Sequence, residues 1–249
     1  MSGGPNICQG RHPLSATLVP TVRRPTSHPW QQLALLALLS PLILGAGPWP
    51  PVHVDDWAAH GVGPLDLSAA WRIYPPAHRA MVFKQPPAIA LDNGRRVLQL
   101  MTDKETMAIG RPFAVDARET PWLVWEWKAL LLPEGGDVRS PRRNDQAGRV
   151  MLLFEGMRAI LYVWDTTAPI GAEARSDSLD LFQRVLIVVR SGPQGIGEWQ
   201  REKRDVYRDY RRLFEDEPTP IKWVGFESHS DDVRSQSSVL FGSVRFEAR

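Results

Sequence analysis

The chain has 249 residues, of which 43% are hydrophobic and 23% charged, as in a globular protein with one sizeable domain or two small ones. Residues 1–46 hold three of the 30 basic residues and no acidic one, so the remainder carries 27 basic against 28 acidic side chains and lacks the basic field of a nucleic-acid-binding protein. Cys8 is the only cysteine, which excludes an intrachain disulfide and a cysteine-based metal cluster in the rest of the chain.

The N-terminal segment contains an uncharged apolar run at 33–46, preceded by Arg23 and Arg24 and followed by small residues. This order is typical of a secretory signal. Counted outward to Trp30 and Trp49, the run reaches the length of a membrane-spanning helix with an aromatic residue at each end. We therefore expect an N-terminal apolar helix at 30–49, either a signal peptide or an uncleaved membrane anchor. A buried helix of a soluble protein is the third alternative. In both exported cases the following domain lies in the periplasm or cell envelope.

The segments beside this run have the composition of irregular structure. Residues 1–29 are rich in Pro, Ser, Thr and Gly and show no periodicity, so we expect a disordered tail. Residues 50–66 contain three prolines and indicate a Pro-rich linker or an extended arm that crosses the domain. The remaining residues, 67–249, are expected to form one β-sandwich domain.

Short β-like runs separated by turn residues follow residue 66. Strands are expected at 71–74, 80–84, 97–101, 122–131, 149–154, 159–164, 181–190, 221–227 and 239–247. The run at 122–131 is the clearest, because its large apolar residues alternate with polar ones from Leu123 to Ala129. The two runs around Glu155–Gly156 are typical of a hairpin, and Gly242 indicates a bulge in the last strand.

One segment, 198–215, has the pattern of an amphipathic helix. Its apolar residues from Trp199 to Phe214 recur near one helical face, and Pro218 follows it. Because strands do not alternate regularly with helices, a doubly wound parallel sheet is disfavoured. The expected fold is mostly β: an antiparallel β-sandwich of jelly-roll type with this one helix.

Several short motifs together resemble a known family. They are Trp125–Glu126–Trp127, Asn144–Arg149, Tyr162–Trp164, a helix motif from Trp199 to Tyr210, and Ser230–Asp231–Asp232. In this combination, over roughly residues 65–247, the chain resembles the bacterial domain-of-unknown-function family 3047. The resemblance implies an exported β-sandwich protein and implies no reaction, because the family has no established activity. The chain departs from the family at the turn before the last strand, where His229 and Val233 replace an acidic residue and a threonine.

The candidate site residues are polar side chains expected at strand ends or on the helix. They are Asp145, Arg149, Asp165, Arg204, Asp209, Asp231 and Asp232. In a structural interpretation, Arg149 or Arg204 pairs with Asp145 or Asp209 and locks the helix to the sheet. In a functional interpretation, the carboxylates form a sugar- or calcium-binding rim, with Asp231–Asp232 as the best calcium candidate. No complete calcium-loop motif is found, so a metal remains an open question.

The tryptophans and the remaining acids allow two further interpretations. Trp164, with Trp125, Trp127 and Trp199, is a candidate carbohydrate platform, whereas the apolar strand face around Trp125 favours core packing. Glu126 and Glu155 are the candidate carboxylates for glycoside hydrolysis, but neither lies in a motif. No zinc-hydrolase, serine-hydrolase or cofactor motif is found in the sequence, and we expect no cofactor.

These observations favour a non-enzymatic cell-envelope protein that binds a glycan or a protein partner. The first alternative is a carbohydrate-active hydrolase of sandwich fold. The second is an accessory subunit of a membrane protein complex, held there through the segment Trp30–Trp49.

Overall fold

The computed structural model describes residues 50–74, 82–176 and 183–249. The early elements are β1 (Val52–His53), the 3-10 helix η1 (Trp57–Ala59), β2 (Gly63–Pro64), β3 (Arg72–Ile73), β4 (Ala88–Asp92), β5 (Arg95–Asp103) and β6 (Thr106–Val115). The central ones are β7 (Trp122–Leu131), β8 (Gly148–Phe154), β9 (Arg158–Asp165), β10 (Glu173–Ser176) and β11 (Gln183–Ser191). The chain ends with β12 (Gln200–Asp205), α1 (Val206–Phe214), β13 (Ile221–His229) and β14 (Gln236–Glu247).

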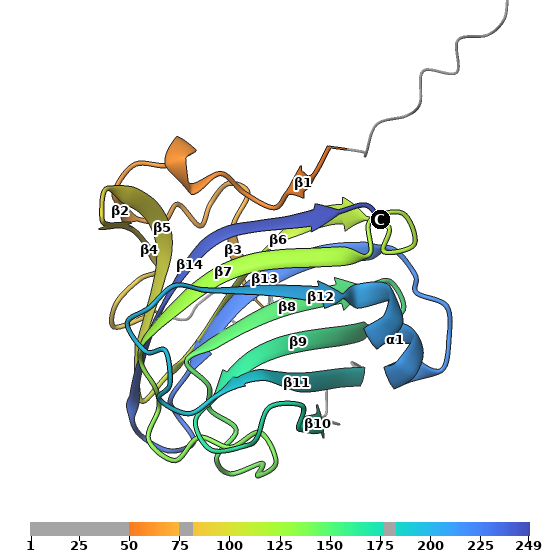
Figure 1. Ribbon diagram of the computed structural model, residues 1–249. Helices are drawn as coiled ribbons and strands as arrows, with labels where there is room; N and C mark the ends of the chain where they lie inside the picture. The colour runs from red at the N-terminus through yellow and green to blue at the C-terminus, as the bar shows by residue number, and fades with distance from the viewer. Residues whose placement is uncertain (1–49, 75–81, 177–182) are drawn as a thin grey trace, which may run out of the picture. The chain divides into compact units, whose positions relative to one another are not determined.

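The described strands form two sheets of seven strands each. Sheet A has the order β12-β7-β14-β5-β4-β2, and β1 pairs with the second half of β14. Sheet B has the order β10-β11-β9-β8-β13-β6-β3, and Figure 1 shows helix α1 at one end of the strands. The expected mostly β, two-sheet sandwich with one helix is confirmed.

The core lies between the sheets and is built on aromatic residues. In β7, Leu123, Trp125, Trp127 and Ala129 are fully buried, as their alternation predicted. The ring of Trp125 stacks on Tyr162 of β9, with the centroids 5.3 Å apart. Tryptophans on the apolar face of one sheet therefore pack against aromatics of the other, which confirms that Trp125 and Trp127 are core residues.

The predicted antiparallel arrangement is wrong at one strand pair. Strand β11 runs parallel to β9, with Val185 opposite Ile160 and Ile187 opposite Tyr162. Strand β10, which was not predicted, pairs antiparallel with the outer edge of β11. Sheet B is therefore mixed. The apolar centre of β11 resembles that of a buried strand in either direction, so its composition did not reveal the orientation.

The predicted helix 198–215 is wrong in its first half. Residues Gln200–Asp205 form β12, which pairs antiparallel with the edge of β7, and only Val206–Phe214 is helical. The carboxylate of Asp205 accepts the backbone N–H of Arg208 and caps the helix. A charged segment gains backbone hydrogen bonds by adding to a free sheet edge, and this tertiary pairing overrides its helical pattern.

Some of the other predicted strands match the structure, and others do not. The hairpin of β8 and β9 and the irregular register beside Gly242 in β14 are confirmed. Strands β4 and β6 were not predicted, and residues 82–84 of the expected strand 80–84 form no strand. Strand β6 contains Gly110 and Pro112, which weaken a β signal in the sequence.

The segment 50–66 lies against the domain. Val54, Trp57 and Leu65 are buried, and Trp57 Nε1 donates to the carbonyl of Gly242 at 2.7 Å. The arm thus contributes side chains to the core, which begins before residue 67.

The disordered tail at 1–29 and the apolar helix at 30–49 were predicted for residues that lie outside those described. Among the described helices, none combines the length and apolar character needed to cross a bilayer.

Candidate functional site

The predicted site residues separate into two groups at opposite ends of β8. Asp145, Arg149, Asp165, Asp231 and Asp232 lie around the beginning of β8, the end of β9 and the turn after β13. Arg204 and Asp209 lie by helix α1, whose Tyr210 packs on Phe154 at the end of β8. The structure therefore does not bring all the candidates to a single rim.

Two connecting segments meet at the first group. The segment before β8 places Asp145 beside the turn between β13 and β14. Its fully buried carboxylate accepts the backbone N–H of Val233 on Oδ2 at 2.8 Å. A second bond joins the same segments, from the His229 N–H to the Gln146 carbonyl at 3.0 Å. These bonds hold Asp145 against His229 and Asp231.

Asp145, His229 and Asp231 each offer one ligand atom within 4.8 Å of the other two. Two neighbouring buried oxygens, Oδ1 of Asp145 and Oδ1 of Asn144, have no hydrogen-bond partner among the described residues. Asp232 also belongs here, because burial and the charge of Asp231 raise its pKa. We call Asn144, Asp145, His229, Asp231 and Asp232 the acidic cluster.

Burial and charge shift the titration of this cluster. Burial raises the pKa of Asp145 to about 6, with a further contribution from Asp231 and Asp232. Burial and the adjacent Arg149 lower the pKa of His229 to about 4, so its imidazole is neutral at pH 7. A neutral imidazole keeps a lone pair on one ring nitrogen, as a metal ligand requires.

Arg149 connects the cluster to the interior of the domain. Its buried guanidinium donates to Glu227 Oε2 at 3.2 Å, to Gln146 Oε1 at 2.7 Å and to the Asn144 carbonyl. The predicted partner of Arg149 was Asp145 or Asp209, but its ion-pair partner is Glu227, which the sequence analysis did not consider. Glu227 also lies 3.1 Å from His229 Nε2.

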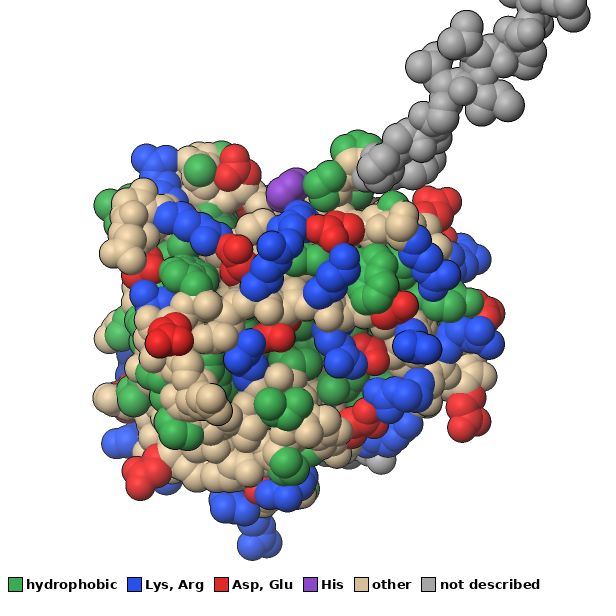
Figure 2. Space-filling view, in the orientation of Figure 1, with side chains coloured by type: hydrophobic (Ala, Val, Ile, Leu, Met, Phe, Trp, Pro, Cys, Tyr) green, Lys and Arg blue, Asp and Glu red, His purple; other side chains and the backbone are tan. Residues whose placement is uncertain are grey.

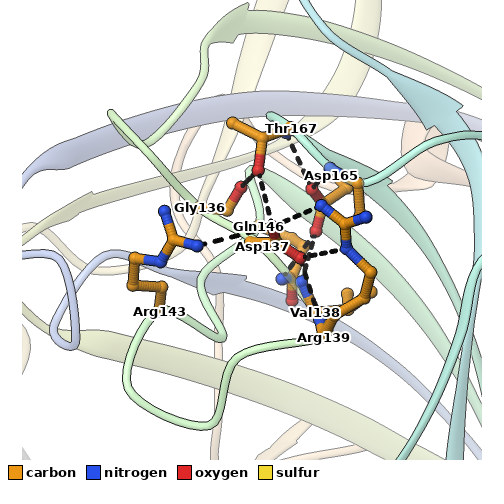
Figure 3. A network of polar contacts seen from close by, with 9 residues as sticks. Gly136, Asp137, Val138, Arg139, Arg143, Gln146, Asp165 and Thr167 are labelled. Atoms are coloured by element: carbon orange, nitrogen blue, oxygen red, sulfur yellow. Dashed lines mark hydrogen bonds and ion pairs between the residues drawn. The ribbon is translucent and has the colours of Figure 1, made fainter.

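The hydrogen bonds of Asp165 hold neighbouring loops in place (Figure 3). Its Oδ1 accepts the N–H groups of Thr167 and Ala168, and its Oδ2 accepts those of Val138 and the Gln146 amide. These four bonds fix two loops to the end of β9. Because both carboxylate oxygens are already occupied, Asp165 has little capacity left for a ligand.

Trp164 is fully buried, so its prediction as a binding residue needs correction. Its ring packs 5.7 Å from that of Trp127, and its Nε1 donates to the Gly192 carbonyl at 3.1 Å. Trp125, Trp127 and Trp164 thus fill the core, because they point between the sheets. Of the four tryptophans in the predicted platform, Trp199 is the half-buried one.

Trp199 lies on the outer side of sheet A within a charged group. Its Nε1 donates to Asp92 Oδ2 at 2.7 Å, and Lys128 Nζ donates to the same carboxylate at 2.9 Å. The guanidinium of Arg95 lies 5.0 Å from the indole centroid and pairs with Glu126. Fixed charged groups therefore lie both over the indole of Trp199 and at its Nε1 edge.

A groove of about 810 Å³ begins beside this group and shares Arg95 with it. The groove lies between the arm at 53–58, the turn joining β4 to β5, and the bulge of β14. It is lined by His53, Asp55, Asp56, Trp57, Ala58, Leu91, Gly94, Arg95, Arg96 and Ser243. The groove could not be recognised in the sequence, because its lining comes from three separate segments, of which 50–66 was predicted to be a linker or an extended arm.

Two residues of the acidic cluster were also missed. His229 was set aside because no second histidine lies at metal-ligand spacing, and Asn144 was noted only as part of a family motif. His229 lies far from Asp145 in the sequence, so the sequence does not show that the two residues meet. The signal that could have identified His229 is its position two residues before Asp231.

Comparison with known proteins gives a family and several distant structures. The family model described as "Protein of unknown function (DUF3047)" matches residues 81–245. No curated protein matches the chain.

Among solved structures, the xyloglucanase domain of NopAA, a type three effector from Sinorhizobium fredii, is 10% identical, with a TM-score of 0.43, covering 78% of this chain and 100% of that one. A family 12 xyloglucanase from Bacillus licheniformis is 9% identical, with a TM-score of 0.40, covering 76% and 90%. The family 30 carbohydrate-binding module of a Clostridium thermocellum cellulosomal cellulase is 10% identical, with a TM-score of 0.33, covering 82% and 94%.

Proposed function

The chain belongs to the DUF3047 family of proteins of unknown function, and we propose that its sandwich binds a glycan in the groove beside Trp199. The observation that carries this proposal is that Arg95 belongs both to the groove and to the charged group around Trp199. This side chain lines the groove and also lies over the indole of Trp199, so an aromatic surface and a polar groove are continuous. Sugar rings pack on aromatic faces while their hydroxyls form hydrogen bonds, and this arrangement offers both contacts.

The groove residues suit a neutral, hydroxyl-rich ligand. Sugar hydroxyls both donate and accept, and the groove presents donors on Arg95 and Arg96 and an acceptor on Asp56. The volume is in the range of sites that enclose a small ligand. Basic and acidic side chains are interspersed over the visible face of the protein, without a large field of one sign (Figure 2). This balance favours an uncharged glycan over a polyanion.

The groove side chains are fixed before a ligand arrives. Arg96 donates to the Ala58 carbonyl at 2.6 Å, and the Asp56 carboxylate accepts the Ala58 N–H at 3.1 Å. Asp55 accepts from His60, Trp71 and Arg111 at 2.6–2.9 Å. Side chains held in this way lose little conformational entropy on binding.

Asp92, the carboxylate bonded to Trp199, is suited to binding a ligand rather than to protonating a leaving group. Hydrogen bonds from Lys128 and Trp199 lower the pKa of Asp92, so it is ionised at neutral pH. A glycosidase needs one carboxyl group with a raised pKa to protonate the leaving group. Asp92 is therefore unsuited to the role of general acid and suited to accepting hydrogen bonds.

The test is a glycan array probed with the full chain, followed by calorimetric titration with the best oligosaccharide. Trp199→Ala should lower the affinity roughly tenfold or more, and Trp199→Phe should retain most of it. Trp122→Ala is the matched control, because this half-buried tryptophan lies at the far end of β7. Equal affinities for Trp199→Ala and the unaltered protein would contradict the proposal. Release of reducing ends from a bound polysaccharide would favour the hydrolase alternative.

The proposed compartment is the cell envelope. This proposal rests on the apolar run at 33–46. Fractionation of cells expressing the full chain, with sequencing of the mature N-terminus, distinguishes a cleaved signal from an anchor. Full-length protein in the cytosolic fraction would contradict this assignment. Co-purification with a membrane assembly would favour the accessory-subunit alternative.

A further inference from the structure

We propose that Asp145, His229 and Asp231 bind one divalent transition-metal ion, of which Zn²⁺ is the representative probe. Their ligand atoms lie within 4.8 Å of one another. A bound cation lies about 2.0–2.2 Å from each donor, so small side-chain movements would bring all three atoms into contact with one ion. The site is separate from the groove beside Trp199, and the inference goes beyond the proposed glycan binding.

The buried carboxylate of Asp145 supplies an observation independent of the clustering. Its side chain is fully buried, its Oδ2 is fixed by the Val233 N–H, and its Oδ1 has no partner among the described residues. A buried carboxylate oxygen without a donor is costly, and protein structures rarely leave one so. A metal ion would supply the missing partner.

The guanidinium of Arg149 reaches the cluster, with Nη1 3.3 Å from His229 Nε2, and it is shared with Glu227. Its other N–H groups donate to Gln146 and to the Asn144 carbonyl, so its single charge is divided among several acceptors. Asp145, Asp231 and Asp232 therefore bring three carboxylates together, and like charges at this spacing repel one another. A divalent ion would relieve this repulsion.

Each proposed ligand has an outer partner that orients it. The Thr106 hydroxyl donates to Asp231 Oδ1 at 2.6 Å, and Glu227 Oε2 lies 3.1 Å from His229 Nε2. Nε2 also lies 3.3 Å from Arg149 Nη1. The tautomer in which Nε2–H donates to Glu227 leaves the lone pair on Nδ1, which is the usual arrangement behind a metal-bound histidine. Asp231 is exposed, so an ion can reach the site from solvent.

The donor set favours a transition metal over calcium. Calcium is usually held by six to eight oxygen atoms, whereas imidazole is a preferred ligand of zinc and its neighbours. A histidine with two carboxylates gives three protein ligands, and a water molecule can complete a tetrahedral set. The proposed ion therefore differs from the calcium that was considered for Asp231–Asp232 in the sequence.

The experiment uses the full chain after treatment with a chelator. Calorimetric titration with Zn²⁺, Mn²⁺ and Ca²⁺ gives affinity and stoichiometry, and the visible spectrum of added Co²⁺ reports the coordination geometry. We expect one Zn²⁺ per chain at the cluster, with weaker binding of Ca²⁺. Asp145→Asn and His229→Gln should each lower Zn²⁺ affinity roughly tenfold or more. Asp66→Asn, an exposed aspartate outside the cluster, should leave it unchanged.

The tail residues Cys8, His12 and His28 are a second potential source of Zn²⁺ binding, so the substitutions decide the outcome. Binding that is undiminished in an Asp145→Asn/His229→Gln double variant would overturn the proposal, as would the absence of Zn²⁺ binding at millimolar concentration. Tighter binding of Ca²⁺ than of Zn²⁺ would overturn the choice of metal class. Thermal unfolding of each variant without metal identifies a variant that does not fold. If Asp145→Asn or His229→Gln does not fold, the Zn²⁺ affinity of Asp231→Asn is measured instead, because this side chain is exposed.

Discussion

Arg204 and Asp209 form an ion pair across the junction of β12 and α1, with Nη2 2.7 Å from Oδ1 and Nε 3.0 Å from Oδ2. The hydroxyl of Tyr162, in sheet B, donates to the same Oδ2 at 2.9 Å. Asp209 thus accepts from a strand of each sheet while it belongs to the helix. The predicted structural role, in which this pair locks the helix to the sheet, is confirmed for Arg204 and Asp209.

Asp209→Ala should lower the free energy of unfolding by about 2–4 kcal/mol. The substitution leaves the buried Tyr162 hydroxyl and the half-buried Arg204 guanidinium without their shared acceptor. Urea unfolding followed by far-UV circular dichroism measures the change. The control is Asp216→Ala, which removes an exposed partner of Arg158 and should change little. Equal effects of the two substitutions would show that the Arg204–Asp209 pair does not stabilise the fold.

The pH dependence of stability should contain a contribution from Tyr162. Burial, with the neighbouring carboxylate of Asp209, raises the pKa of Tyr162 well above the ordinary value of 10.0. Above pH 10 the unfolded chain loses this proton while the folded protein keeps it, so stability falls as the pH rises. The slope approaches about 1.4 kcal/mol per pH unit for one proton.

Tyr162→Phe removes this titration, so the free energy of unfolding should fall less steeply as the pH rises. The measurement is the free energy of unfolding at pH 9, 10 and 11 for both proteins. The difference between them should narrow as the pH rises, because only the unaltered protein loses stability through this group. A constant difference over that range would exclude the predicted contribution.

The parts of the fold that could be predicted are those in which side-chain periodicity agrees with the final environment. Strand β7 is an example, because its alternate residues Leu123, Trp125, Trp127 and Ala129 all belong to the core between the sheets. The opposite case is β12, whose residues Gln200–Asp205 have a helical pattern but pair with β7 at a sheet edge. Pairing between distant segments decides such cases, and local sequence does not encode it.

The candidate site illustrates the same limit. Asp145 and Asp231 could be selected as carboxylates in turn regions, and the structure places them together with His229. The partner of Arg149 could not be chosen, since Glu227 lies within the apolar pattern of β13 and becomes adjacent through strand pairing. Trp164 could not be distinguished from a surface tryptophan without knowing which face of β9 meets sheet A.

Close packing of β6 against β13 makes Gly110 sensitive to substitution. Gly110 lies opposite Gly225, and a Cβ atom on Gly110 would lie 1.9 Å from Nε1 of the Trp223 indole. Gly110→Ala should therefore destabilise the domain by about 1–3 kcal/mol, because the indole must move. Thermal unfolding measures the effect. Gly61→Ala, where no neighbouring atom lies within 4 Å, is the control. If Gly110→Ala lowers the stability of the Trp223→Ala variant as much as it lowers that of the unaltered protein, the predicted clash with the indole is disproved.

Three buried hydroxyls join the two sheets. Ser237 of β14 lies 2.7 Å from Thr102 of β5 and 2.6 Å from Ser228 of β13, measured between the hydroxyl oxygens. Ser237→Ala removes both short bonds and leaves the other two buried hydroxyls 3.5 Å apart. We expect it to lower the free energy of unfolding by about 1–3 kcal/mol, since buried polar groups without partners are costly.

Removing all three hydroxyls should cost less than removing the central one. In the variant Thr102→Val/Ser228→Ala/Ser237→Ala no hydroxyl of the group remains, so no buried donor or acceptor is left without a partner. Chemical unfolding of the single and triple variants measures the difference. A triple variant that loses more stability than Ser237→Ala would indicate that the hydroxyls stabilise the sandwich directly. The smaller loss we expect would show that the group chiefly satisfies its own members and fixes how sheet B lies on sheet A.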